Sequence, residues 1–121
     1  MKKIKTFLEA CEKLGIDPKA ALPYPDPKNR DEISINAYSK LVIIVRVLNE
    51  GWIPDWNNSD QYKYWPYFDM RSKPGFGFSN ASYVYWCTDS AVGSRLCFKS
   101  RELAEYAANT FLNIYDEYIN L

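Results

Sequence analysis

The chain has 121 residues and a formal net charge of zero, from 15 basic and 15 acidic residues. This length predicts a single domain with a core of its own, and the charge balance argues against bulk attraction to nucleic acid or to an anionic membrane. Because the sequence has no histidine and its three cysteines form no Cys-x-x-Cys pair, we expect neither a metal site nor a cofactor.

The N-terminal part predicts two helices joined by a stiff connector. Residues 3–14 place apolar side chains at helical spacing and end before Gly15. The prolines that follow predict an extended segment, so residues 1–28 are expected to form a helix and connector, and residues 29–121 the main body. Residues 30–50 predict a long helix, because the 3.6-residue period outweighs the β-branched run LVIIV. Neither a signal peptide nor a membrane span is predicted, so we expect a cytoplasmic protein.

The second half predicts three strands and a last helix. The strands are expected at 63–71, 82–88 and 95–99, and the helix at 101–119 after Ser100 as N-cap. Pro66 marks the first strand as an edge strand or as the site of a bulge. The predicted fold is therefore α+β, in the order α-α-β-β-β-α, with a three-stranded antiparallel meander covered by helices on one face.

Alternation along these strands predicts one apolar face and one face of rings and cations. If the turn at 89–93 pairs Trp86 with Leu96 and Val84 with Phe98, these four side chains meet the helices. A slip of one residue would invert the assignment. The opposite face, which we name the predicted sheet face, then carries the candidate binding residues Trp65, Tyr67, Arg71, Tyr83, Tyr85, Arg95 and Lys99.

Three interpretations of the predicted sheet face stay open. The N-terminal helix covers it as a second core layer, or it contacts a protein partner or a second copy of the chain, since Tyr, Trp and Arg are enriched at interfaces. Alternatively, its rings stack the bases of single-stranded nucleic acid or of a small nucleotide, and its cations hold the phosphates. The leading hypothesis is a non-enzymatic binding module that acts through protein–protein contact.

The segment GWIPDWNN, residues 51–58, provides a secondary candidate site. Trp52 and Trp56 flank Asp55, an arrangement that suits a sugar or a cation. The alternative is a loop pinned to the core by its tryptophans, in which Asp55 or Asn57 bonds the local backbone. A third functional hypothesis is a small hydrolase that uses Asp55 or Asp69 as its carboxylate.

Three segments carry a family resemblance: NEGWIPDWNN at 49–58, KYWPYF at 63–68 and VGSRLCFKSRELAEYAANTF at 92–111. On these, residues 38–118 resemble a family of small uncharacterised proteins from gut bacteria of the Bacteroides group and from their phages and mobile elements. The resemblance implies a cytoplasmic accessory protein of a phage or mobile element. Such a protein is expected to bind a host protein, a nucleic acid or a signalling nucleotide.

Overall fold

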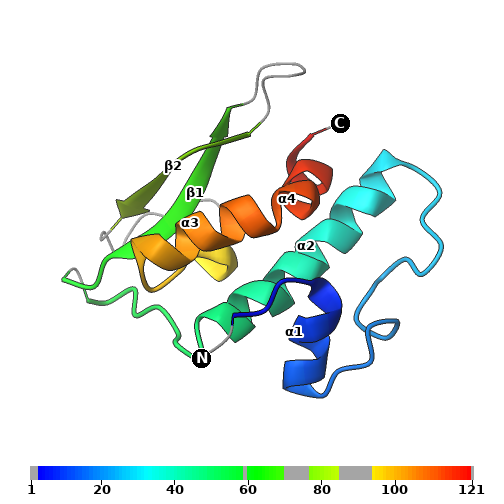
Figure 1. Cartoon of the computed structure of the whole chain (residues 1–121), viewed down its shortest axis with the longest axis horizontal. Coiled ribbons are helices and arrows are strands. Elements are labelled where there is room, and N and C mark those ends of the chain that lie inside the picture. The colour runs from blue at the N-terminus through cyan, green and yellow to red at the C-terminus, as the bar shows by residue number, and fades with distance from the viewer. Residues whose placement is uncertain (1–2, 59, 70–76, 85–93, 121) are drawn as a thin grey trace.

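The computed structural model describes residues 3–58, 60–69, 77–84 and 94–120 (Figure 1). This part of the chain is mostly helical and contains one two-stranded antiparallel sheet. In chain order the elements are α1 (Phe7–Leu14), α2 (Arg30–Leu48), β1 (Lys63–Asp69), β2 (Gly77–Val84), the single 3-10 turn η1 (Ser94–Leu96), α3 (Arg101–Thr110) and α4 (Leu112–Ile119).

The prediction of a three-stranded meander in an α-α-β-β-β-α fold is wrong. The expected third strand at 95–99 is replaced by η1 and by one isolated bridge, in which Phe98 and Tyr64 exchange both backbone hydrogen bonds. Phe98 therefore pairs with β1, whereas the meander placed it beside Val84, which instead pairs with Lys63. The turn at 89–93 and Trp86, the predicted partner of Leu96, lie outside the described residues.

Two residues explain why the bridge at Phe98 does not extend into a strand. In an antiparallel ladder the next hydrogen-bonded pair after Tyr64 and Phe98 is Pro66 with Leu96, and proline has no N–H to donate. On the other edge of residues 97–99, the side chain of Asn49 forms the hydrogen bonds that a neighbouring strand would otherwise form. Its Nδ2 donates to the Cys97 carbonyl at 3.0 Å, and its Oδ1 accepts from the Lys99 N–H at 3.1 Å.

Within the sheet, Pro66 is tolerated because its backbone nitrogen faces away from β2. The lack of an N–H there therefore costs no hydrogen bond between the two strands. The expectation of an irregular first strand is confirmed nearby, where the register shifts between Tyr67 and Phe68. Tyr64 and Phe68 pack against the hydrophobic core. The ring of Phe68 lies 4.8 Å from that of the buried Tyr115.

The elements form successive layers across the molecule: the sheet, the α3–α4 pair, α2 and finally α1 (Figure 1). α3 packs on both strands, α4 packs on α2, and α1 packs on α2. The N-terminal helix therefore lies on the side of α2 away from the sheet. The interpretation in which α1 covers the predicted sheet face is wrong.

The helices α1, α2 and α3 each begin where a side chain accepts hydrogen bonds from the first free N–H groups. Thr6 and Glu9 form a capping box at α1, Asn29 caps α2 by accepting from the Glu32 N–H at 2.9 Å, and Ser100 caps α3. The prediction of a helix over the run LVIIV is confirmed, because α2 continues to Leu48. The helix predicted at 101–119 is divided into α3 and α4 at Phe111, because the ψ of this residue, 29°, lies outside the helical range.

Candidate functional site

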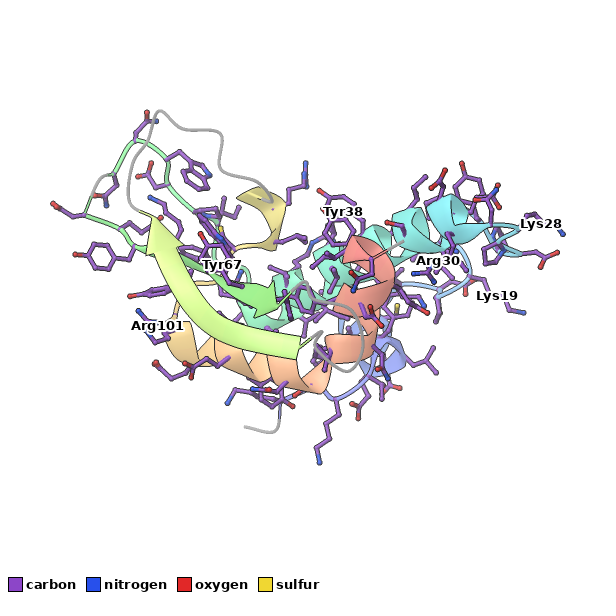
Figure 2. All side chains as sticks on the ribbon, turned by 90° about the horizontal axis from the view of Figure 1, so that it is seen from above. Lys19, Lys28, Arg30, Tyr38, Tyr67 and Arg101 are labelled. Carbon is purple, nitrogen blue, oxygen red and sulfur yellow. The ribbon has the colours of Figure 1, made fainter. Side chains whose placement is uncertain are left out.

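The structure separates the members of the predicted sheet face. Trp65 and Tyr67 lie together on β1, with ring centres 6.4 Å apart, and Tyr67 is 47% exposed. Tyr67 lies at the opposite end of the molecule from Lys19, Lys28 and Arg30 (Figure 2). Tyr83 is in β2 opposite Tyr64. Arg71 and Tyr85 lie outside the described residues.

Two cations of the predicted sheet face, Arg95 and Lys99, belong to the described residues, and neither lies on a strand. Arg95 is in η1 and exposed, and Lys99 follows the bridge, where its ammonium lies 3.3 Å from the Glu50 carboxylate. Their placement on one sheet face with Trp65 and Tyr67 is therefore wrong. The cause is the missing third strand, which was to have carried both side chains.

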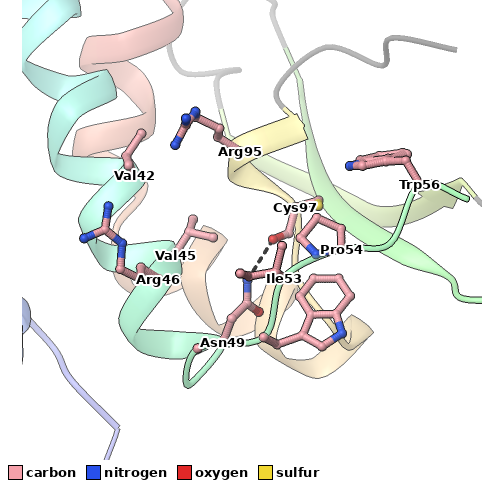
Figure 3. A pocket seen from close by; sticks show the side chains of 11 residues that line it. Val42, Val45, Arg46, Asn49, Ile53, Pro54, Trp56, Arg95 and Cys97 are labelled. Atoms are coloured by element: carbon pink, nitrogen blue, oxygen red, sulfur yellow. Dashed lines mark hydrogen bonds between the residues drawn. The ribbon is translucent and has the colours of Figure 1, made fainter. Parts of the chain in front are cut away.

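Arg95 instead joins the secondary candidates Trp52 and Trp56 around an open groove of about 590 Å³ (Figure 3). We call it the tryptophan groove. Its eleven lining residues come from the second half of α2, the segment after it, and the stretch around η1. They are Val42, Val45, Arg46, Asn49, Gly51, Trp52, Ile53, Pro54, Trp56, Arg95 and Cys97.

The backbone at the base of the tryptophan groove is fixed by Asn49, which is buried and ties the end of α2 to Cys97 and Lys99. The chain then reverses through two residues with positive φ, Glu50 at 53° and Gly51 at 83°. Glycine adopts this conformation freely, whereas glutamate does so rarely. The reversal brings Trp52 and Ile53 back beside α2.

The Trp56 side of the groove is held by a buried lysine. Lys63, 0% exposed, donates from Nζ to the carbonyl oxygens of Asp55 at 2.7 Å and Asn58 at 3.1 Å. Its ammonium also lies 5.0 Å from the centre of the Trp56 ring, within the range of a cation–π interaction. The loop between residues 54 and 62 is therefore built around this ammonium.

Asp55 helps to close this loop and does not line the groove. Its carboxylate accepts from the Asn57 N–H at 3.0 Å, and its own N–H donates to Gln61 Oε1 at 2.6 Å. The interpretation of Asp55 as a residue that bonds the local backbone is confirmed. The same interpretation expected Trp52 and Trp56 to pin the loop to the core. In the structure, both side chains line the tryptophan groove.

The tryptophan groove is cationic and partly apolar. Two guanidinium groups, Arg46 and Arg95, line it, and among the residues that the structure describes no carboxylate does. Neither arginine forms an ion pair with another described residue. Ile53 is 80% exposed, the most exposed of the large hydrophobic side chains in the described part of the chain. The site can therefore accept an anionic group beside apolar or aromatic groups.

Two residues of this site were missed by sequence reasoning. Arg46 places a charge inside the apolar run LVIIVRVL, five residues before Gly51. This interruption could have identified Arg46 as a candidate site residue. Lys63 gave no signal, because its burial depends on a loop that folds back over it. Burial also raises the pKa of the Cys97 thiol, to about 11, which keeps this groove residue neutral.

Within residues 3–58, 60–69, 77–84 and 94–120, no group of three or more acidic or cysteine side chains is placed to hold a metal ion. No helix of this part combines the length and the apolar character needed to cross a membrane. In comparisons with known proteins, no family model, no curated protein and no solved structure matches the chain.

Proposed function

We propose that this protein is a binding module that docks a protein partner in the tryptophan groove. The observation that carries the proposal is the juxtaposition of Trp52, Trp56 and Arg95 with the exposed Ile53. Tryptophan and arginine are the residues that most often dominate the energy of protein interfaces. An exposed aliphatic side chain beside them suits an apolar side chain of a partner.

The shape of the groove supports a macromolecular ligand. Small-molecule sites enclose most of their ligand, whereas this groove is only partly enclosed. Four of its described lining residues are aliphatic: Val42, Val45, Ile53 and Pro54. Trp52 and Trp56 can stack on a nucleobase, whereas these aliphatic groups cannot, and the net charge of zero gives no long-range attraction to a phosphate backbone. Both features favour a protein partner over a single strand.

The proposed role fits the cytoplasmic accessory protein of a phage or mobile element that the family resemblance implies. An accessory protein of this kind is expected to engage a host protein. In this proposal Trp65 and Tyr67, which remain together on β1, are not part of the contact. They provide a matched comparison outside the lining of the groove.

The experiment is a selection of displayed random peptides on the whole protein, followed by affinity measurements on variants. We expect enriched peptides whose affinity falls at least tenfold in Trp56→Ala and in Arg95→Glu, because hot-spot truncations cost about 2 kcal/mol or more. Trp65→Ala is the control, since it removes the same side chain from the sheet surface. All variants are compared by melting temperature, so that loss of binding is separated from loss of fold.

Two results would contradict the proposal. One is a selection in which no peptide is enriched, or in which Trp65→Ala weakens binding as much as Trp56→Ala. The other comes from titrating tryptophan fluorescence with mixed single-stranded oligonucleotides at low and physiological salt. Saturable quenching that weakens as salt rises would assign the groove to nucleic acid, because phosphate contacts release counterions.

A further inference from the structure

A second hollow lies on the other side of the last turn of α2. It has a volume of about 540 Å³ and is lined by ten residues from α1 and the segment before it, from the end of α2, and from α3. We call it the α1–α2 hollow. Its lining residues are Lys3, Ile4, Lys13, Leu14, Arg46, Val47, Leu48, Glu50, Gly51 and Leu103.

The two hollows meet at the end of α2. Arg46 and Gly51 line both of them. A specific protein contact engages about 20 to 30 residues on each side, more than the eleven that line the tryptophan groove. A partner seated in that groove must therefore extend onto adjoining surface, and the α1–α2 hollow is the adjoining recess that shares a cation with it.

The charge around the α1–α2 hollow identifies the chemistry of the occupant. Among the described lining residues three are cations, Lys3, Lys13 and Arg46, and one is a carboxylate, Glu50, which is paired with Lys99 at 3.3 Å. The chain as a whole is neutral, so this excess of positive charge is local.

Two other carboxylates, those of Glu9 and Glu12, line a smaller hollow together with the same two lysines. Glu9 is already engaged, because its carboxylate accepts from the N–H groups of Lys5 and Thr6. Arg46, the cation shared with the tryptophan groove, does not line this smaller hollow.

The floor of the α1–α2 hollow is apolar. Ile4 and Leu48 are buried within it, and Leu14, at the end of α1, is 37% exposed at its rim. Apolar side chains of a partner would be buried on this floor while its acidic side chains meet the cations above.

We infer that the partner presents an acidic, apolar-rich segment that runs from the tryptophan groove past Arg46 into the α1–α2 hollow. This inference rests on the proposed function and specifies the partner's chemistry. The segment places an aromatic or aliphatic side chain against Trp56, a carboxylate at Arg46, and a second apolar side chain beside Leu14.

The test uses two displayed peptide libraries that share the same apolar residues. One contains only Asp and Glu as charged residues, and the other only Lys and Arg. The acidic library is expected to enrich binders on the whole protein, and the basic library is not. The best acidic peptide should lose about tenfold in affinity on Leu14→Asp, and a smaller factor on Lys13→Gln, since rim charges act mainly on association rate.

Two matched variants control for position. Leu8→Asp changes a leucine of the same helix that is 63% exposed and does not line the hollow. Lys19→Gln removes a cation at the connector end of the molecule (Figure 2). Neither should change affinity, and melting temperatures of all four variants confirm that the fold is kept.

The outcomes separate this inference from the proposed function. If Trp56→Ala abolishes peptide binding while Leu14→Asp and Lys13→Gln do not alter it, the groove stands and the inference is wrong. Enrichment of the basic library in place of the acidic one also overturns it. If neither Trp56→Ala nor Leu14→Asp changes binding, both the proposed function and the inference are wrong.

Discussion

The ammonium of Lys63 lies 5.0 Å from the centre of the Trp56 ring and donates hydrogen bonds to the carbonyl oxygens of Asp55 and Asn58. A charge this deeply buried is stable only when hydrogen bonds and an aromatic face replace its water. Lys63 therefore positions Trp56, and with it one wall of the tryptophan groove.

Replacing Lys63 by methionine keeps the apolar stem and removes the ammonium. We expect the free energy of unfolding to fall by about 2 to 4 kcal/mol, because two hydrogen bonds from a charged donor are lost. Urea unfolding followed by circular dichroism measures the change. The control is Lys99→Met, which breaks only the exposed pair with Glu50 and should change stability by less than about 1 kcal/mol. Equal stability of the two variants would contradict the structural role of Lys63.

Asn49 is predicted to be the residue that sets the position of the segment after α2. Asn49→Ala leaves the Cys97 carbonyl and the Lys99 N–H without their partner, and should cost about 2 kcal/mol. Asn49→Asp should not restore stability, because a carboxylate cannot donate to a carbonyl. Thermal unfolding measures both. Full stability of Asn49→Asp would show that the donated bond is not needed.

The same segment shows how far the sequence alone predicts the fold. The helix over LVIIV was predictable because its apolar period is long and Gly51 follows soon after its end. The third strand was wrong because the pattern at 95–99 resembles a strand in isolation. Only the structure shows that Pro66 ends the pairing beside it and that the Asn49 amide takes the other edge.

The candidate site was predictable in part. Trp52, Trp56 and Arg95 each stood out in the sequence, the first two as a pair and the third as a cation among rings. Their association was not predictable, since it joins the end of α2 to η1 across more than 40 residues of chain. The burial of Lys63 was not predictable, because strand alternation says nothing of a loop that folds over one residue.

Removing the Tyr115 hydroxyl is predicted to raise stability, in contrast to the substitutions of Lys63 and Asn49. Its hydroxyl is buried and has no hydrogen-bond partner in the described part of the structure, and burial raises the pKa of this tyrosine. Tyr115→Phe keeps the ring that packs on Phe68 and removes the unpaired group, so stability should rise by about 1 kcal/mol. The melting temperature is the measurement.

The matched variant is Tyr106→Phe, which deletes a hydroxyl that donates to the Ile4 carbonyl at 2.8 Å. Its stability should fall by about 1 kcal/mol. A loss of stability in Tyr115→Phe similar to that in Tyr106→Phe would show that the Tyr115 hydroxyl has a partner in solution.

Cys97 predicts how stability depends on alkaline pH. Burial raises the pKa of its thiol from 9.0 to about 11, so between these values the unfolded chain ionises this group and the folded chain does not. The unfolded state then binds fewer protons, and stability falls as pH rises through this window, by up to about 2 to 3 kcal/mol. Urea unfolding of wild type and Cys97→Ala across pH 9 to 11 isolates the effect, because the other titrating groups are common to both. Parallel pH profiles would contradict the prediction.

The most direct test of the central claim follows the indole N–H signals of the four tryptophans in a nitrogen-15 NMR spectrum, assigned by single Trp→Phe variants. An acidic peptide from the selection is then added to the labelled protein. Docking in the tryptophan groove predicts that the signals of Trp52 and Trp56 shift while that of Trp65 keeps its position. A shift of Trp65 alone, with Trp52 and Trp56 unchanged, would move the binding site to the sheet and contradict the assignment made here.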